Sequence, residues 1–540
     1  MAGGGRARPR RPDGRILAFV LCCALLAVGC THRSGRSGEP GAGAGAATPR
    51  SGGTLRIALV TPGPLDPAQA VSAERRLLVG NLFDSLTTLD ADGAVRPAAA
   101  ASWSGDQTLR HWRFQLRPGG RYADGQPVQA RDFKAAWERL ANPRTRPRPA
   151  APAALLGLVD GYQAMAAGRT RSISGLSAPD PATLVVDLSQ PFADFPTVVA
   201  DPRLSPLPPK ALARGASALA ARPIGNGPFM LAKPQGGKAL DLVRNPRYAG
   251  RAAYLDRVRV RVVPDQQTAW LAFQHGQVSF APVPPDQVAA ARLIAGASGD
   301  GRGRPGLLQG PELGTWSIGF DPHSKQGSDP RWRRAVSLAL DRSSLAAAFQ
   351  GAVVPAAGIV PAGVRGARQT PCPSCVHDPG QAGALLDLIG DGARKPVVMA
   401  VAATAFDREV AAIVAQQLAK VGLPVEVKEV RGALGPSAVA RAQLLGSGQA
   451  ADFPRIDPFL AGLQDGRVQS LVAQARRTAD QTARTRIYQR AEQAALDAAD
   501  VVPVVQYQHT AVLAPGVEGF DLTPWSSVDL SACSLANWAK

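Results

Sequence analysis

The segment from residue 396 to residue 430 constrains the fold more than any other part of the sequence. Residues 397–401 form a short apolar stretch, and residues 425–430 form a second one rich in valine. Between them, apolar residues recur at helical spacing over 410–421, with Asp407 as the expected N-cap. Two strands joined through a helix by short connections run parallel, and helices then cover the sheet. The sequence therefore predicts an α/β protein.

Other segments extend this prediction along the chain. Alternation predicts strands at 54–60 and 111–116, and a buried strand at 501–507. Helical spacing predicts helices at 132–140, 332–340, 343–349 and 487–496. Asp132 is the expected cap of the helix at 132–140, and Asp341 is the expected cap of the helix at 343–349.

Length and charge set limits on the class of protein. A chain of 540 residues suggests two to four structural units. The net charge is +19, but Arg and Lys are scattered and only 5% of residues are aromatic. A nucleic-acid surface needs a basic stripe with interleaved aromatic residues. We therefore expect no nucleic-acid partner.

The first thirty residues predict export. An Arg-rich stretch, 1–15, precedes a continuous apolar run at 16–28, which is too short for a comfortable bilayer crossing and is typical of a secretory signal. The following residues have little apolar bulk and no periodicity. We interpret 1–29 as a signal peptide and 30–52 as a flexible tether.

Small residues immediately before Cys30 resemble the end of a bacterial lipoprotein signal. That resemblance implies that Cys30 is lipidated, becomes the mature N-terminus, and anchors the protein to the outer face of the cell membrane. The alternative is a buried N-terminal helix with an incidental cysteine. No second apolar run of this length follows.

Three cysteines lie beyond the signal and the anchor: Cys372, Cys375 and Cys533. Outside the cytoplasm, the closely spaced pair Cys372 and Cys375 is expected to form a local disulfide that closes a loop. Cys533 is left single or exchanges partners with this pair, and His377 alone does not complete a metal site.

Motifs for catalysis are missing from the sequence. It contains no nucleophile elbow, no paired-histidine zinc motif and no phosphate-binding loop of the Walker type. Residues 301–306 fit G-x-G-x-x-G, but they include Pro305 and follow no clear strand. We expect no catalytic residue, no cofactor and no metal, and thus a binding protein rather than an enzyme.

Several segments, in order, resemble the bacterial extracellular solute-binding proteins of family 5, the peptide- and oligopeptide-binding lipoproteins of ABC importers. They are residues 81–103, 112–140 (WRFQLRPGGRYADGQPVQARDFKAAWERL, the most specific), 224–231 (IGNGPFML), 244–250 (RNPRYAG), 329–342 (DPRWRRAVSLALDR) and 451–460 (ADFPRIDPFL).

The resemblance implies a type II periplasmic-binding-protein fold, with two α/β lobes joined by a hinge and an additional inserted domain. Lobe one would take residues 53–90, 223–314 and 504–540. The inserted domain would take 91–222, and lobe two 315–503.

The resemblance also implies a ligand site. Asp452 matches an acidic residue that holds the α-ammonium group of a peptide, with Ala451 and Phe453 beside it. Backbone groups near Gly448, and near Val60 and Thr61, would pair with an extended ligand as an added strand.

The sequence departs from the family near this site. Gln449 stands where the family has Trp, and Arg455 follows where it has Asp. Two interpretations of Arg455 compete: it pairs with Asp452, or it meets a carboxylate of the ligand. In a third interpretation, Asp452 caps its own loop. Trp316, Trp332 and Trp525 line either a cleft or the core.

Together these observations predict a monomeric, lipid-anchored receptor that captures a peptide or peptide-like solute and delivers it to an ABC permease and ATPase. Three alternatives stay open: a receptor of the same fold for a non-peptide solute such as an oligosaccharide or metal chelate, a secreted hydrolase with an unrecognised triad, and a lipoprotein whose cleft has degenerated.

Overall fold

The computed structural model describes residues 49–536, apart from 150, 235–237, 296–305, 369–371, 373–374, 432–433 and 435–441. The predicted signal peptide, Cys30, most of the tether and the glycine-rich motif up to residue 305 lie outside the described residues. Across the part of the chain that is described, no helix combines the length and the apolar character needed to cross a membrane.

One large mixed sheet organises the described chain, with ten strands in its main path and β13 (Val353–Pro355) paired to the side of β17. In spatial order the path runs through β15 (Val425–Val430), β14 (Val397–Ala402), β16 (Leu444–Ala450), β12 (Gly306–Phe320), β17 (Val501–Leu513), β11 (Phe280–Pro282), β1 (Thr54–Val60), β10 (Arg257–Val263), β9 (Ala239–Arg244) and β8 (Phe229–Leu231).

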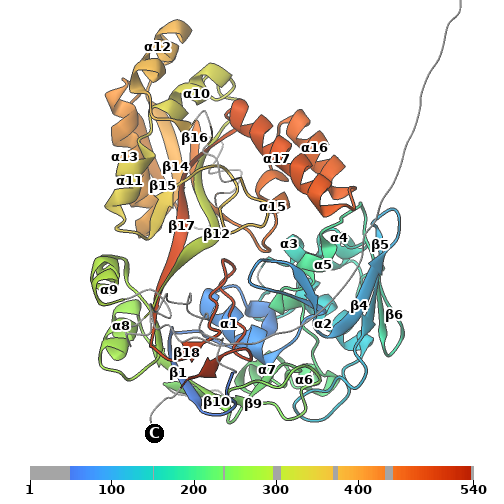
Figure 1. Cartoon of the computed structure of the whole chain (residues 1–540). Coiled ribbons are helices and arrows are strands. Elements are labelled where there is room, and N and C mark those ends of the chain that lie inside the picture. Colours follow the sequence, from blue (N-terminus) through green and yellow to red (C-terminus); the bar gives the residue numbers. More distant parts are fainter. Residues whose placement is uncertain are drawn as a thin grey trace, which may run out of the picture. The chain divides into compact units, whose positions relative to one another are not determined.

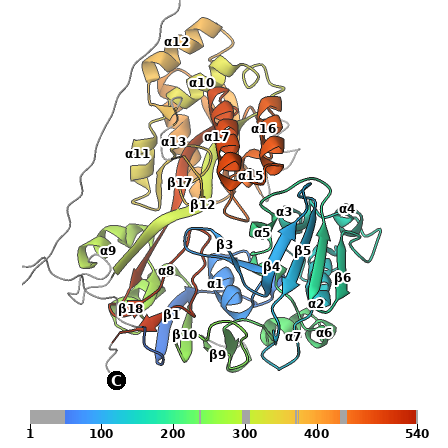
Figure 2. The same ribbon diagram turned by 45° about the vertical axis from the view of Figure 1, so that its right-hand side comes forward.

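Strands β12 and β17 connect the two halves of this sheet. They are the longest strands described, at 15 and 13 residues, and they pair antiparallel with each other. One part of β12 also pairs with β16, whereas the far end of β17 pairs with β11. Figures 1 and 2 show both strands running from the group around β14 and β16 to the group around β1. Each half of the sheet thus builds its own layer of helices.

The predicted crossover unit is confirmed. Strands β14 and β15 pair parallel, and α13 (Ala405–Lys420) connects them. The helix buries Val410, Val414 and Leu418 against the sheet, at the helical spacing seen in the sequence. The predicted cap, Asp407, is wrong. Thr404 is the N-cap, and its hydroxyl accepts a hydrogen bond of 3.0 Å from the backbone N–H of Asp407.

A second, four-stranded antiparallel sheet lies within residues 91–222. Its order is β4 (Ala100–Gly105), β5 (His111–Leu116), β7 (Thr183–Asp187) and β6 (Leu176–Asp180), and α2 (Ala130–Ala141) packs against it. The predicted alternation in β5 is confirmed, because every second side chain is buried. The predicted cap of α2, Asp132, is also wrong: Gln129 is the N-cap, and its N–H donates to the Asp132 carboxylate at 2.9 Å.

Separate hydrophobic cores belong to the two halves of the large sheet. One core joins β1 to the four-stranded sheet and includes Trp112 and Trp137, while the other surrounds β14 and α13 and includes Trp316 and Trp332. A further core packs α15 (Asp457–Leu460), α16 (Gly466–Arg476) and α17 (Gln481–Asp497) together. Helix α1 (Ala73–Leu82) lies beside η2 (Pro202–Leu204), a short 3₁₀ helix that positions the site.

Candidate functional site

Asp452 lies just beyond β16, between the two halves of the sheet. The backbone N–H of Ala451 donates to the carbonyl of Leu313 at 2.9 Å, which extends the pairing of β16 with β12 by one residue. The Asp452 side chain is 29% exposed. It lines two adjoining cavities whose empty space, with the open solvent at their mouths included, is about 660 and about 800 Å³, so its carboxylate is accessible from both.

Two of the other predicted site residues share these cavities. Ala451 lines the larger one, and Phe453 lines the smaller one. Phe453 is nonetheless mostly buried and meets Phe192 edge to face, with ring centroids 6.2 Å apart. Its aromatic ring therefore forms the floor of the cavity rather than a freely exposed contact.

The remaining predicted residues lie away from Asp452. Val60 and Thr61 line none of the cavities that contain Asp452, and the N–H of Thr61 already donates to the carbonyl of Val263 at 3.0 Å. Gly448 lies in β16 against the side chain of Tyr507. The structure thus places Ala451, Asp452 and Phe453 on these cavities. Val60 and Thr61 do not line them, and Gly448 contributes only through Tyr507, which lines one of them.

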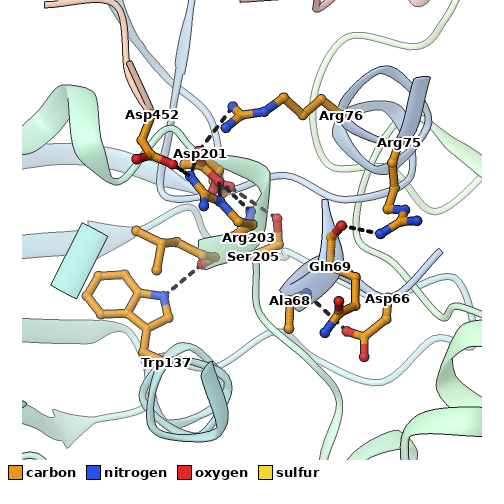
Figure 3. A network of polar contacts seen from close by, with 12 residues as sticks. Asp66, Ala68, Gln69, Arg75, Arg76, Trp137, Asp201, Arg203, Ser205 and Asp452 are labelled. Carbon is orange, nitrogen blue, oxygen red and sulfur yellow. Dashed lines mark hydrogen bonds and ion pairs between the residues drawn. The ribbon is translucent and has the colours of Figure 1, made fainter. Parts of the chain in front are cut away.

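An ion-pair network holds Asp452 in place (Figure 3). Arg203 donates from Nη2 to Asp452 Oδ1 at 2.6 Å, and it also binds both carboxylate oxygens of Asp201 at 2.9 Å. Arg76 of α1 reaches Asp201 at 3.2 Å. Two arginines and two aspartates therefore alternate, and their formal charges balance.

Burial makes this network strongly coupled. The side chains of Arg203 and Asp201 are 0% and 1% exposed. Burial opposes the charge on Asp201, but Arg203 and Arg76 outweigh it and lower the pKa of Asp201. Burial likewise opposes the charge on Arg203, but Asp201 and then Asp452 raise the pKa of Arg203 above its usual value. Both buried groups stay ionised because each has its counter-charge.

The backbone around Arg203 is fixed by local hydrogen bonds. Asp201 is the N-cap of η2, and its carbonyl accepts from the hydroxyl of Ser85 at 2.8 Å. The indole N–H of Trp137 donates to the carbonyl of Leu204 at 2.8 Å (Figure 3). Arg203 is therefore a preorganised partner for Asp452 rather than a mobile surface side chain.

Arg455 does not pair with Asp452, so that interpretation is wrong. Its guanidinium binds Asp194 at 3.3 Å and the carbonyl of Gly93 at 3.1 Å. Arg484 of α17 shares the same Asp194 carboxylate at 3.1 Å. Arg455, three residues after Asp452, thus belongs to a separate buried cluster.

The three tryptophans separate clearly. Trp316 and Trp332 are fully buried, and their indole N–H groups donate to Asp407 at 2.8 Å and to the carbonyl of Ala393 at 3.0 Å. Trp525 is half-buried and lines both cavities next to Asp452. Of the three, Trp525 is the cleft residue.

The cysteines lie apart from the cavities. Cys372 and Cys375 form a disulfide in the structure, and Cys533 is a free, buried thiol. Burial, followed by the charges of Asp529 and Asp521, raises the pKa of the Cys533 thiol well above its usual value. Cys533 is therefore an unreactive thiol of the core.

Residues that sequence reasoning missed hold the candidate site together. Arg203 lies 249 residues before Asp452, and Arg76 is a further 127 residues away along the chain. Neither belongs to a motif, and no signal in a single sequence pairs them with Asp452. Only the fold brings them into one ion-pair network with Asp452.

Two long strands join the halves of the sheet, and the accessible carboxylate of Asp452 lines cavities between these halves. This arrangement defines a two-lobe binding protein. The chain belongs to the bacterial extracellular solute-binding proteins of family 5. The model described as "Bacterial extracellular solute-binding proteins, family 5 Middle" matches residues 94–469.

Individual relatives agree with this assignment. The chain is 26% identical to the periplasmic murein peptide-binding protein MppA of Escherichia coli, over 93% of this chain and 96% of MppA. It is 27% identical to the probable deoxycholate-binding periplasmic protein YgiS of Escherichia coli, over 85% of this chain and 89% of YgiS.

A solved structure shows the shared fold. The unliganded open form of the murein tripeptide binding protein MppA superposes with a TM-score of 0.77 at 23% identity, covering 89% of this chain and 97% of that one. The predicted type II periplasmic-binding-protein fold is thereby confirmed.

Proposed function

We propose that the protein is the substrate-binding component of an ABC importer and captures peptides or peptide-like solutes between its lobes. The observation that carries this proposal is the accessible carboxylate of Asp452, fixed by Arg203 at the meeting point of two cavities. The naming of MppA as a murein peptide-binding protein supports the same ligand class.

Asp452 suits one end of a peptide. Arg203 holds Oδ1, and among the described residues no hydrogen bond to Oδ2 is found. A fixed carboxylate in a partly dehydrated cavity binds an ammonium group more strongly than a solvated one does. We propose that Oδ2 accepts from the α-ammonium group, with Ala451 and Phe453 beside it. No bond of the solute is made or broken.

Lobe closure would trap the solute. In this proposal lobe one comprises 53–90, 223–314 and 504–540, the inserted domain 91–222, and lobe two 315–503. The hinge is the pair β12 and β17, which crosses between the lobes. A bound solute stabilises the closed state by its higher affinity for that state.

The anchor and the partners complete the proposal. Lipidated Cys30 would tether a monomeric receptor to the outer face of the membrane, near its permease and ATPase. Replacing Cys30 with Ala should release the exported protein into the medium or periplasm, which fractionation measures. Retention of the variant in the membrane fraction would contradict the lipid anchor.

A thermal-shift screen against pooled tri- to pentapeptides tests the ligand class. A peptide at 100 times its Kd stabilises the folded protein by about 2.7 kcal/mol, which raises Tm measurably. We expect a smaller rise in Asp452→Asn. Equal rises in both proteins would contradict the ammonium role, and no rise in either would contradict the peptide class.

A second candidate function is capture of an amphipathic non-peptide solute. It is supported by the similarity to YgiS, which is named as a probable deoxycholate-binding protein. Deoxycholate therefore belongs in the same screen. A rise with deoxycholate and none with peptides would favour this candidate.

A further inference from the structure

A second carboxylate, Glu312, lies in the same system of cavities as Asp452. Glu312 lines the cavity of about 800 Å³ together with Asp452, and it also lines a neighbouring cavity of about 910 Å³. The residue belongs to β12, between Pro311 and Thr315, where the register with β17 shifts. This bulge frees Glu312 from the regular pairing of the two long strands.

The negative charge of Glu312 is uncompensated. Among the described residues it makes no ion pair and no side-chain hydrogen bond. The charged group that acts on it is Glu74 of α1, which repels it; burial first and this repulsion second raise the pKa of Glu312. Arg76 lines the same cavity but is bound to Asp201 at 3.2 Å.

The nearest histidine does not supply a counter-charge either. His509 of β17 lines the 910 Å³ cavity with Glu312, and burial lowers the pKa of His509 to about 4. It is therefore neutral near pH 7. The Nδ1 atom of His509 has no hydrogen-bond partner among the described residues.

Aromatic side chains form part of the wall around this carboxylate. Tyr507 and Trp525 both line the cavity of about 800 Å³ with Glu312. The position of Tyr507 requires two glycines: a Cβ atom at Gly448 would lie 2.1 Å from its hydroxyl oxygen, and one at Gly314 would lie 2.3 Å from its Cδ2. The backbone is therefore shaped to hold the Tyr507 ring at this wall.

We propose that Glu312 binds a cationic group of the solute, an ammonium or a guanidinium, in the cavity that Tyr507 and Trp525 line. A carboxylate in a cavity lined by aromatic rings attracts such cations through charge and through the ring quadrupole. For a peptide, the α-ammonium group would meet Asp452 and a Lys or Arg side chain would meet Glu312. The inference rests on the proposed function and narrows its ligand class to cationic solutes.

The test uses two peptide pools that differ in one charge. One pool contains tri- to pentapeptides with a single Lys, and the other contains the same peptides with Nε-acetyllysine. Binding to the mature protein, Glu312→Gln and Glu409→Gln is measured by calorimetry. Glu409 is an exposed carboxylate of α13 that lines neither of the cavities containing Glu312, and it is the matched control.

The expected result is a preference of the unaltered protein for the Lys pool of roughly 10- to 100-fold, the range of a charged hydrogen bond. The preference should vanish in Glu312→Gln and persist in Glu409→Gln. Equal binding of both pools by the unaltered protein would overturn the inference and leave the peptide function standing.

Failure of the peptide function gives a different pattern. If neither pool binds, agmatine, a small guanidinium compound, decides the question by thermal shift. A rise in Tm for the unaltered protein that Glu312→Gln lacks would support a cation site for a non-peptide solute. No rise with agmatine would overturn the inference as well.

Discussion

The two carboxylates of the cavity, Asp452 and Glu312, differ in whether a cationic side chain pairs with them. Asp452 is fixed by Arg203 at 2.6 Å, within a network in which two arginines balance two aspartates. Glu312 has no cationic partner among the described residues and faces another carboxylate, Glu74.

The difference shows how one carboxylate of a cleft can hold the ligand while another selects the charge of the ligand. Arg203 holds the Asp452 carboxylate in place, but it also takes much of the electrostatic attraction that a ligand ammonium would otherwise receive. In the protein without ligand, burial of the unpaired Glu312 carboxylate is unfavourable, and a bound cation offsets this unfavourable free energy. We therefore expect ligand charge to be selected mainly at Glu312.

Removing Arg203, the partner of Asp452, should have the largest effect on the free energy of unfolding. Among the described residues, Arg203→Leu leaves the almost fully buried Asp201 with Arg76 as its one remaining ion-pair partner, and leaves Asp452 without an ion-pair partner. Breaking a buried pair in this way costs about 3–5 kcal/mol. Urea unfolding measures the loss.

Asp452→Asn is the matched comparison for that variant. Asp452 is 29% exposed, and Arg203 keeps Asp201 as a partner when Asp452 loses its charge. A loss of about 1 kcal/mol is expected. Equal losses in Arg203→Leu and Asp452→Asn would show that the buried pair with Asp201 is not what stabilises this side.

Crowding the aromatic wall on the unpaired side should have an intermediate effect. In Gly448→Ala the new Cβ would overlap the hydroxyl of Tyr507, which lies 2.1 Å away. Overpacking of this kind costs about 1–3 kcal/mol, and unfolding in urea measures it. Binding of the Lys peptide pool should weaken as Tyr507 is displaced.

Two controls accompany the glycine variant. Adding Tyr507→Phe removes the overlapping oxygen and should restore part of the stability, since the next ring atom lies 3.1 Å from the Cβ. Gly383→Ala, in a helix with open space around it, should be neutral or slightly stabilising. A loss in Gly383→Ala as large as in Gly448→Ala would contradict the packing argument.

The smallest effect is a pH-dependent gain in stability from Glu312→Gln. Burial and Glu74 raise the pKa of Glu312 in the folded protein. Its proton therefore stabilises the fold fully below the unfolded pKa, about 4.3, and this stabilisation is lost as pH rises through the raised folded value. Tyr507, His509 and Arg76 also face this region.

The measurement is Tm against pH without ligand. Glutamine carries no such dependence, so Glu312→Gln should match the unaltered protein near pH 4 and exceed it near pH 7. Glu409→Gln should follow the unaltered protein throughout. A variant that is less stable at pH 7 would show that Glu312 has a favourable partner.

Local patterns predicted much of the fold. The valines of β14 and β15 and the helical spacing of α13 identified the parallel crossover, because burial of β14 and of one face of α13 leaves a direct trace in the sequence. The errors fell on helix caps. Asp132 and Asp407 are three residues inside their helices, where an acidic side chain also favours the first turn.

The site was predicted only in part. Asp452 and its neighbours carry a family motif, so the sequence located one wall of the cavity. Arg203 and Arg76 come from segments hundreds of residues away, and the bulge that releases Glu312 depends on the register between two strands. Pairings of this kind follow from tertiary packing, which a single sequence does not reveal.

The most direct test of the account places Asp452→Asn beside Glu312→Gln and measures Kd for one Lys peptide in three forms: unmodified, acetylated on the α-amine, and acetylated on the side chain. If Glu312 selects the charge of the ligand, side-chain acetylation should cost the unaltered protein more affinity than α-acetylation does. Glu312→Gln should abolish only the side-chain effect, and Asp452→Asn only the α-amine effect. Sensitivity to side-chain charge that survives in Glu312→Gln but disappears in Asp452→Asn would contradict the account.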